Sequence, residues 1–390
     1  MLSEIVNDMI NKKLYFIAWN LANNNDTSQF RYFQTIIAFY IGKQHEGLRT
    51  SNELLLYSQI LGQTYIDVIK RNLCFYALPL ECTHTAIESH DPKWNFMNPS
   101  ICLDHKQELA INVRAVNYKI VEGRYFINGL SPSATNPVVT KNFRTNILLS
   151  SITPFNPKDT SMLKYPGFHV EGLEDLRLFL FKEKIHFLAT TRQLNPQGIN
   201  QIVLGNEDTC VPLKIIGSKA LQCEKNWLPV VMNNKLTIIY CLGPKLIVME
   251  HISDGNCKII IEQKLPVNTE GFRGSAGPVE INTNQYLVIS HEVTVKDNQR
   301  HYYHRFLLFD KKFNLHKISL PFVMKGKQPI EYISGLAKLQ NTLYITWGQN
   351  DAKAFISEIH LNKLLSFLTP IRDCQNGYQY NNQHQKQLKN

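Results

Sequence analysis

Carboxylates and an arginine open one of the most apolar segments of this 390-residue chain, EDLRLFLF at residues 174–181. A carboxylate held at the start of a strand can act as a general acid or base, because the strand fixes its position. We predict Asp175 as the catalytic acid, with Arg177 on the same face to keep it ionised or to orient it. Since adjacent strand residues point to opposite faces, only one of Glu174 and Asp175 is expected to face a pocket. The alternative is a structural pair of Asp175 and Arg177 within one sheet.

A group of cationic side chains stands in other segments of the chain. Lys225, Arg192, Arg273 and His291 can each donate a charge-assisted hydrogen bond, which suits a phosphate group or another small oxyanion. We predict anion binding by Lys225, Arg192 and His291, with Arg177 as a further member of the group. The alternative for Arg273 is that it only closes the glycine-rich turn GFRGSAGP in which it stands.

Several polar residues share one feature, which is a place at the edge of an apolar segment that we expect to be an inner strand. A buried polar group without a partner costs about 1–3 kcal/mol. A recurring set of such groups therefore predicts one shared wet cavity, and the alternative is that each side chain pairs locally and closes a turn. The set comprises Asn98, Arg114, Asp175, Arg177, Arg192, Glu224, Lys225, Arg273, His291, Glu331 and Asp351.

Three aromatic residues are candidate platforms for a sugar ring, namely Trp227, Trp347 and Tyr303. An aromatic face suits the apolar face of a pyranose. The alternative is that each of the three belongs to the hydrophobic core.

The segments that carry these residues repeat one pattern about every fifty residues. Each copy has a short apolar strand, a polar turn and a stronger apolar strand, as in EDLRLFLFKEKIHFLATTR and SAGPVEINTNQYLVISHEV. Taking Asp175, Asn226, Gly277 and Gly335 as equivalent gives spacings of 51, 51 and 58 residues, and an earlier copy begins at Asn98. This period predicts a mainly β fold, a five-bladed β-propeller with one four-stranded blade per repeat. A propeller gathers the starts of its inner strands around one central pocket.

The chain divides into three regions by composition. Residues 92–370, rich in Val, Ile, Tyr and Phe, are the predicted propeller. Residues 1–88 are predicted to form a small α-helical domain of four helices, similar to tetratricopeptide hairpins, because apolar residues recur at three- and four-residue steps. This domain is either an interaction surface for a protein partner or a cover over one side of the propeller. The polar tail, residues 371–390, is predicted to be disordered.

Bulk properties restrict the partners and the compartment. Lys plus Arg number 42 and Asp plus Glu number 32, so the net charge is +10, but the basic residues are scattered and we predict no nucleic-acid partner. The eight cysteines form no CxxC pair, which predicts reduced thiols, and no metal-ligand spacing is present. The N-terminal residues resemble neither a signal peptide nor a membrane span. We expect a cytoplasmic protein, while delivery by another export route stays open.

Some common catalytic motifs are missing from the sequence. It has no glycine-rich phosphate loop, no GxSxG elbow and no βαβ unit of the kind that binds nucleotide sugars. Their absence argues against a nucleotide-dependent transferase of the usual α/β type.

Residues 95–365 resemble the five-bladed propeller of glycoside hydrolase family 130, the mannoside phosphorylases and related hydrolases, and the kindred glycosyltransferase family 108. The resemblance rests on motifs that occur in the same order and at blade spacing. One departure is Leu176, which stands where the family's Glu-Asp-Pro-Arg signature has proline. The matching positions are Asn98-Pro99, Arg114, Glu174 through Arg177, Lys225-Asn226, Gly274 through His291, and Gly348 through Asp351.

The resemblance implies a set of roles for these residues. Asp175 would be the proton donor, acting through a hydroxyl of the bound sugar while phosphate attacks the anomeric carbon with inversion. Lys225, Arg192 and His291 would bind the phosphate. No cofactor is implied, only inorganic phosphate or a sugar 1-phosphate as co-substrate. The residues implied around the sugar are Asn98, Arg114 and Asp351, and we further predict sugar contacts by Asn117, Asn226 and Glu331.

We therefore expect a carbohydrate-active enzyme of the glycoside phosphorylase or glycosyltransferase type. It would transfer a glycosyl unit, with β-mannosyl favoured, to or from an oligosaccharide or another acceptor, and hydrolysis by water stays open. The alternatives are a nucleotide-sugar-dependent glycosyltransferase and a non-catalytic propeller that binds a glycan or a protein.

Overall fold

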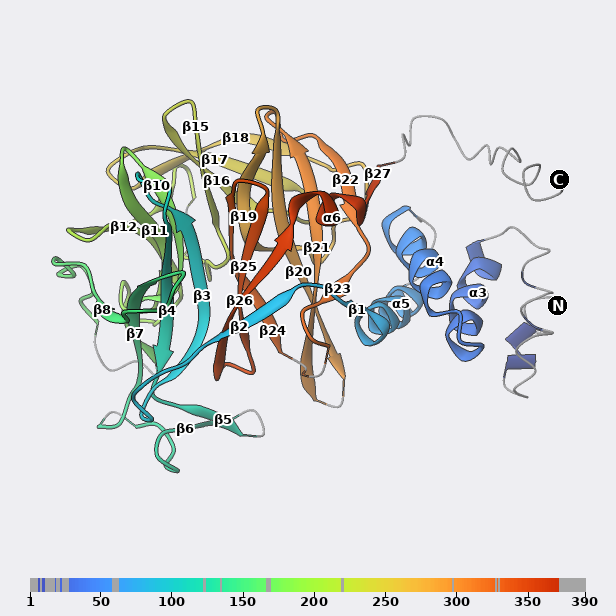
Figure 1. Cartoon of the computed structure of the whole chain (residues 1–390), viewed down its shortest axis with the longest axis horizontal. Helices are drawn as coiled ribbons and strands as arrows, with labels where there is room; N and C mark the ends of the chain where they lie inside the picture. The colour runs from blue at the N-terminus through green and yellow to red at the C-terminus, as the bar shows by residue number, and fades with distance from the viewer. Residues whose placement is uncertain are drawn as a thin grey trace.

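The computed structural model describes residues 6–7, 9–10, 18, 22, 28–57, 63–121, 124–133, 135–165, 170–218, 221–296, 298–326, 328 and 330–371. The fold is mainly β, as predicted, with helices gathered toward the N-terminal end of the chain (Figure 1). The predicted first helix lies mostly, and the predicted disordered tail beyond Ile371 wholly, outside the described residues.

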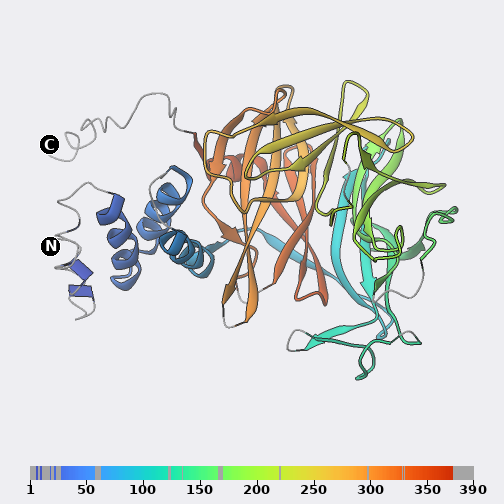
Figure 2. The same cartoon turned by 180° about the vertical axis from the view of Figure 1, so that it is seen from behind.

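Helices precede the strands along the chain and lie beside one edge of the β structure (Figures 1 and 2). They are α3 (Ser28–Tyr40), α4 (Gln44–Tyr57) and α5 (Gln63–Tyr76). Their apolar residues recur at three- and four-residue steps, so each helix has one apolar face. These faces form a shared core that includes Ile37, Leu48, Leu55, Ile69 and Leu73.

The helical region ends at Tyr76, ahead of the predicted boundary at residue 88. Residues that we assigned to the helical domain form β1 (Leu78–Pro79) and β2 (Thr83–Ile87) instead. β2 pairs antiparallel with a strand from near the C-terminal end of the described chain. The segment after the helices is therefore part of the β structure, which ties its beginning to its end.

The strands form five sheets of four or more strands within the described residues. Each is named here by its order along the chain, and its strands are mostly antiparallel neighbours in sequence. Sheet 1 has β3 (Asn95–Leu103), β4 (Leu109–Val116), β7 (Val138–Asn146), β8 (Thr153–Phe155) and β9 (Val170–Glu171). Sheet 2 has β10 (Glu174–Phe181), β11 (Lys184–Thr191), β12 (Gln201–Gly205) and β13 (Cys210–Pro212). Sheet 3 has β15 (Leu228–Met232), β16 (Lys235–Cys241), β17 (Leu246–Ser253), β18 (Asn256–Gln263) and β14 (Lys214–Ile215).

The last two sheets also take strands from outside their own repeat. Sheet 4 has β19 (Arg273–Asn282), β20 (Gln285–Lys296), β21 (Gln299–Asp310), β22 (Leu315–Ser319), β23 (Phe322–Val323), β1 and β27 (Leu368–Pro370). Sheet 5 has β24 (Glu331–Leu339), β25 (Thr342–Gln349), β26 (Lys353–His360) and β2. A short helix, α6 (Leu361–Ser366), follows β26, and a separate hairpin consists of β5 (Lys119–Val121) and β6 (Arg124–Phe126).

The inner strands of the five sheets contact one another in a closed cycle. β3 contacts β10, β10 contacts β15, β15 contacts β19, β19 contacts β24, and β24 contacts β3 again. An apolar core fills each junction between successive sheets. Phe187 belongs to the core between sheets 1 and 2, and Trp347 to the core between sheets 4 and 5. The cycle has no open gap, which fixes the relative positions of the five inner strands.

The repeated motif of the sequence corresponds to a backbone irregularity in the inner strands. Asn98, Asp175, Asn226 and Gly277 all have positive φ angles, of 41°, 51°, 63° and 81°. Asn, Asp and Gly are the residues that enter this left-handed region most readily. The pairing register shifts beside Asn98, Asp175 and Gly277, as expected for β-bulges.

The fifth equivalent residue, Gly335, is needed for a different reason. A Cβ added there would lie 2.2 Å from Oγ1 of Thr346 and 2.8 Å from the backbone nitrogen of Ile101. Only glycine lets β24 approach β3 this closely, and this approach closes the cycle. The repeat that predicted blades therefore marks the positions where inner strands bend and pack.

Candidate active site

A charge network centred on Arg114 lies at the end of the cycle where the inner strands begin. The guanidinium of Arg114, on β4, binds two carboxylates: Nη2 lies 2.8 Å from Oε2 of Glu174, and Nη1 lies 2.9 Å from Oδ1 of Asp175. Nε and Nη2 also donate to Oγ1 of Thr140, at 3.3 and 3.2 Å. Nδ2 of Asn98 donates to the same Oδ1 of Asp175 at 3.0 Å. Arg114 and Asn98, predicted to contact a sugar, are thus bound to the acid candidate.

Both carboxylates of the Glu174-Asp175 pair bind one arginine, so the prediction that only one of them faces the site is wrong. A regular strand would place them on opposite faces. The positive φ of Asp175 and the register shift between Glu174 and Arg177 break that alternation. The ion-pair partner of Asp175 is accordingly Arg114 of sheet 1, not the expected Arg177 of its own strand.

The carboxyl groups of Asp175 and Asp351 have pKa values shifted in opposite directions. Burial alone would raise the pKa of Asp175, but Arg114 and the hydrogen bonds from Asn98 and Arg114 lower it below its ordinary 3.8. Burial raises the pKa of Asp351 above 3.8; Arg114 opposes this shift, and the charges of Asp175 and Glu174 add to it. Two neighbouring carboxyls with pKa values pushed apart are what acid–base chemistry uses.

Three segments extend past the starts of the inner strands and surround this network. The β5–β6 hairpin follows β4, whose last residue Val116 pairs with Asn95 at the start of β3. The β25–β26 turn carries Asp351, and Gln349 before it pairs with Glu331 at the start of β24. The β20–β21 ribbon continues beyond the pair of Arg273 and His291. All three project toward the same end of the molecule (Figure 1).

Lys225 joins two pockets at this end. A narrow pocket beside the network is lined by Glu174, Asp175, Lys225 and Asn226, among others. A neighbouring cleft of about 540 Å³ is lined by Lys225, Asn226 and Arg273, with glycines of two turns. Lys225 and Arg273 are exposed, so both ammonium and guanidinium groups are available to a ligand. Of the predicted cations, these two are the ones that the structure brings into one cleft.

Arg177 is buried and its guanidinium is already occupied. It donates to the backbone oxygen of Ser275, to that of Ser334 at 3.1 Å, and to the hydroxyl of Tyr332 at 2.6 Å. It also donates to Oδ1 of Asn226 at 3.4 Å. Arg177 therefore ties four inner-strand segments together, and in this structure it presents no free charge to an anion.

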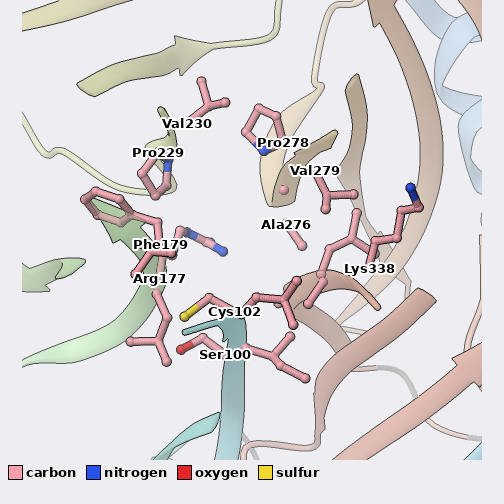
Figure 3. Close-up of a pocket in the computed structure, with 18 of the residues that line it drawn as sticks. Ser100, Cys102, Arg177, Phe179, Pro229, Val230, Ala276, Pro278, Val279 and Lys338 are labelled. Atoms are coloured by element: carbon pink, nitrogen blue, oxygen red, sulfur yellow. The ribbon is translucent and has the colours of Figure 1, made fainter. Parts of the chain in front are cut away.

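A second cavity lies on the far side of Arg177, between the later parts of the inner strands (Figure 3). It measures about 330 Å³, and all five sheets contribute to its lining. Figure 3 shows Cys102, Phe179, Val230 and Val279 around it, with Arg177 at its edge. Its wall mixes apolar residues with Glu280 and Lys338, and Glu174, Asp175 and Lys225 do not line it, so the candidate chemistry lies at the other end.

His291, predicted as a phosphate ligand, is buried among aromatic rings. Its ring lies edge-on to Tyr332 at 5.2 Å between centroids and 5.7 Å from Tyr302. Burial, and then the charges of His304, Arg177 and Arg273, lower its pKa well below 6.5. His291 is therefore a neutral imidazole here and does not add to the positive charge of the cleft.

Glu331 and Asn117, predicted around a sugar, are engaged with backbone groups. The Glu331 carboxylate accepts from the backbone N–H groups of Met324, Lys325 and Gly326 at 2.6 to 3.2 Å. Asn117 accepts from the backbone of Val139 at 2.8 Å and donates to that of Pro137 at 3.1 Å. Both side chains hold loops in place.

The predicted aromatic platforms are all core residues. Trp227, Trp347 and Tyr303 are buried, and each donates a hydrogen bond to a neighbouring side chain. The indole of Trp227 donates to Glu224. Burial raises the pKa of Glu224, and the hydrogen bond from Trp227 partly offsets that rise. Their rings are not available for stacking on a ligand.

Arg192 lies just after β11, and its Nε is buried without a hydrogen-bond partner among the described residues.

Residues that sequence reasoning missed lie on the projecting segments. Tyr125 is on the β5–β6 hairpin, while Arg300 and Tyr302 are on the β20–β21 ribbon near Asp351. The segment KIVEGRYF, a short alternating run around Glu-Gly, was the signal for the hairpin.

Two further observations concern other kinds of site. Across the described ranges, no group of three or more His, Cys, Asp or Glu side chains is placed to hold a metal ion. Among the helices of the part of the chain described above, none is long and apolar enough to cross a membrane.

Comparison with known proteins gives structural neighbours alone. No protein-family model matches the sequence, and no curated protein matches it. The fold is similar to β-1,2-mannobiose phosphorylase from Listeria innocua, with a TM-score of 0.49 and 10% identity over 74% of this chain and 99% of that one. It is also similar to MPT-4, a mannose phosphorylase from Leishmania mexicana, with a TM-score of 0.47 and 13% identity over 78% and 95% of the two chains.

A third similar structure belongs to the GH130 family of mannoside phosphorylases, which contains glycoside hydrolases that target β-1,2 mannosidic linkages in Candida mannan. Its TM-score is 0.47 and its identity 13%, over 69% of this chain and 85% of that one. Similarities of this size assign no role to any residue of this chain.

Proposed function

We propose that the chain is a carbohydrate-active enzyme that transfers a glycosyl unit by inverting phosphorolysis or its reverse. The observation that carries the proposal is the arrangement around Asp175. This carboxylate is held by Arg114 and Asn98 beside a pocket that Lys225 also lines. Inversion needs an acid or base on one face of the sugar and a nucleophile on the other. Asp175 can transfer the proton, Lys225 can hold the phosphate that attacks as nucleophile, and both residues line one pocket.

The lowered pKa of Asp175 suits this residue to the role of general base in the synthetic direction. Its lowered pKa makes Asp175 a carboxylate, which can accept a proton from an acceptor or sugar hydroxyl when a sugar 1-phosphate donates its glycosyl unit. By microscopic reversibility the same residue returns that proton in phosphorolysis. A phosphate dianion bound near Lys225 would raise the pKa of Asp175 and so supply the protonated form.

The cleft lined by Lys225 and Arg273 is the proposed anion site. Both side chains are exposed, and the turn between Gly271 and Gly274 brings backbone close to them. Charge-assisted hydrogen bonds from these two cations suit a phosphate. Of the anion ligands predicted from the sequence, Lys225 is kept, Arg177 is left out because it is occupied, and His291 is left out because it is neutral. Arg192 stays a predicted anion ligand.

We also propose that the five sheets are the blades of a five-bladed β-propeller and that the helices form an attached domain. The closed cycle of inner strands and the core at each junction support the first statement. The shared apolar core of α3, α4 and α5 supports the second. The helical domain is a candidate surface for a protein partner.

The test is the variant Asp175→Asn in a reaction of mannose 1-phosphate with sugar acceptors, with released phosphate as the readout. Mannosides come first because the sequence motifs resemble those of mannoside phosphorylases. We expect a loss of about 10²–10⁴-fold in turnover, the usual contribution of a general acid or base. The fold should persist, because asparagine tolerates the positive φ of this position and Glu174 still binds Arg114.

Asp208→Asn is the matched control. Asp208 is also ion-paired, lying 2.8 Å from the Nζ of Lys158, but it stands on the surface of sheet 2. Its loss should leave turnover unchanged. Wild-type turnover in Asp175→Asn would contradict the proposal.

The rival is a non-catalytic glycan-binding propeller, which the structural use of Arg177, Glu331 and Asn117 favours. In that case neither the wild type nor Asp175→Asn consumes a sugar 1-phosphate. Release of free sugar without phosphate would indicate a hydrolase instead.

A further inference from the structure

The β5–β6 hairpin is part of the molecule that the proposed chemistry does not use. It belongs to none of the five sheets, yet it leaves β4 directly beside the start of β3, where Asn98 lies. Its base is well anchored: Tyr118 is buried, its backbone oxygen accepts from Nδ2 of Asn95 at 2.7 Å, and its hydroxyl lies 3.9 Å from Sδ of Met97. The hairpin is therefore fixed relative to the carboxylates.

Tyr125 is an exposed aromatic side chain of this hairpin that interacts electrostatically with charged groups of the site. Its ring stands edge-on to the buried ring of Tyr118, with 4.9 Å between centroids, and 42% of the residue remains exposed. Burial, and then the carboxylates of Asp351 and Glu174, raise the pKa of its hydroxyl, while the charges of Arg114 and Arg192 oppose that shift. An aromatic ring that is braced on one side and open on the other is suited to stack on a ligand.

We propose that Tyr125 is the stacking platform for a second sugar unit, the one on the acceptor side of the glycosidic bond. The inference rests on the proposed function and adds a substrate requirement to it. Its ligand is a disaccharide or longer glycoside whose second ring lies between the hairpin and the turn that carries Asp351. The three aromatic residues suggested by the sequence are buried, and the ring of Tyr302, also near Asp351, packs against His291 and Tyr332, whereas Tyr125 is exposed.

The distribution of charge explains why a sugar and not the phosphate belongs on this side. Lys225 and Arg273 line the cleft at sheets 3 and 4. The charged groups that act on Tyr125 are the carboxylates of Asp351 and Glu174 and the guanidinium groups of Arg114 and Arg192. Arg114 is already paired with Glu174 and Asp175, and carboxylates accept hydrogen bonds from sugar hydroxyls. The pocket thus has one side with exposed cations and another side with an aromatic ring among paired, mixed charges.

The test measures acceptor kinetics of the full chain with mannose 1-phosphate as donor and with mannose or mannobiose as acceptor. We expect Tyr125→Ala to raise the KM for both acceptors, mannose and mannobiose, about tenfold, the effect of losing one stacking contact. The KM for mannose 1-phosphate should stay within about twofold, because a lost platform does not touch the donor side. Tyr125→Phe and Tyr125→Trp keep a ring and should restore the low acceptor KM.

Leu130→Ala is the matched control, since Leu130 is an exposed apolar residue that follows the same hairpin. It should leave these KM values unchanged. An unchanged mannobiose KM in Tyr125→Ala, with an active wild type, overturns the platform but leaves the proposed function standing. A wild type that neither turns over these sugars nor gives saturation-transfer NMR signals with mannobiose overturns both.

Discussion

Arg114 and Arg305 are both buried arginines that bind a glutamate, but their surroundings differ. Nε of Arg305 lies 2.6 Å from Oε1 of Glu292, and both side chains are sealed, at 0% and 4% exposure. Arg114 is as deeply buried, at 5%, yet its partners Glu174 and Asp175 are 13% and 27% exposed. One network is closed to solvent, and the other opens on a pocket.

The sealed network joins the helices to the β structure. Nη1 of Arg305, on β21, donates to Oδ1 of Asn52 on α4, and the hydroxyl of Tyr303 donates to Glu292 at 2.9 Å. The open network has no such link and holds a carboxylate at a pocket instead. Under the proposed function, the sealed ion pair serves attachment and the solvent-exposed one serves chemistry.

Glu292→Ala tests the sealed network and should have the largest effect on stability. Removing the carboxylate leaves the Arg305 charge buried and unpaired, which costs about 3–5 kcal/mol. The measurement is urea unfolding followed by circular dichroism. A loss below about 1 kcal/mol would contradict the view that Glu292 neutralises the buried charge of Arg305.

The double variant Glu292→Leu with Arg305→Met is the control. Replacing both charges by apolar groups of similar size is often nearly neutral. It should therefore recover most of the stability that Glu292→Ala loses. If it does not, the unpaired charge is not the cause of the loss.

Arg114→Met tests the open network, where we expect a smaller loss of stability and a larger loss of activity. The two carboxylates can hydrate or take up a proton when the arginine is gone, so the cost in stability should be about 1–3 kcal/mol. Turnover should fall about 10²-fold, because Asp175 loses the group that positions it. Parallel unfolding and phosphate-release assays give both quantities.

Arg114→Lys separates charge from geometry. Lysine keeps the positive charge but cannot bind Glu174 and Asp175 with two planar nitrogens. We expect stability near that of the wild type and turnover still reduced. Full activity in this variant would mean that charge alone positions the acid.

The repeat predicted the mainly β fold and the positions of the inner strands, because Asn, Asp and Gly at one spacing mark places where strands bend. It also placed Asp175, Asn98 and Arg114, which the structure brings together. These predictions rest on local sequence patterns, and each depends on only a few neighbouring residues.

The partners of buried side chains could not be predicted in the same way. From the alternation of side chains along a strand we expected Asp175 to pair with Arg177. A β-bulge breaks that alternation, and the carboxylate of Asp175 pairs instead with Arg114 on another sheet. His291 and Glu331 have suitable types for a site, yet burial makes one neutral and backbone N–H groups occupy the other. Burial depends on how the whole chain folds, so it cannot be read from the spacing of residues in the sequence.

Asp351→Asn tests the opposed pKa shifts within the open network and should give the smallest change in stability. The pKa of Asp351 is raised in the folded chain, so its ionisation opposes folding once the pH exceeds 3.8. Asparagine keeps the shape and the positive φ of 51° without the charge. We expect the variant to be more stable than the wild type at pH 7 by about 0.5–1 kcal/mol.

The pH dependence identifies the cause. Below pH 3.8 Asp351 is protonated in both states, so the advantage of Asp351→Asn should vanish there and grow as the pH rises through the raised pKa. Asp175→Asn should behave oppositely, because the lowered pKa of Asp175 stabilises the wild type above 3.8, and that contribution disappears as the pH falls through it. Urea unfolding from pH 3 to 7 measures both curves. Curves of the same sign would mean that the two carboxylates do not form an opposed pair, and the open network would then differ from the sealed one only in exposure.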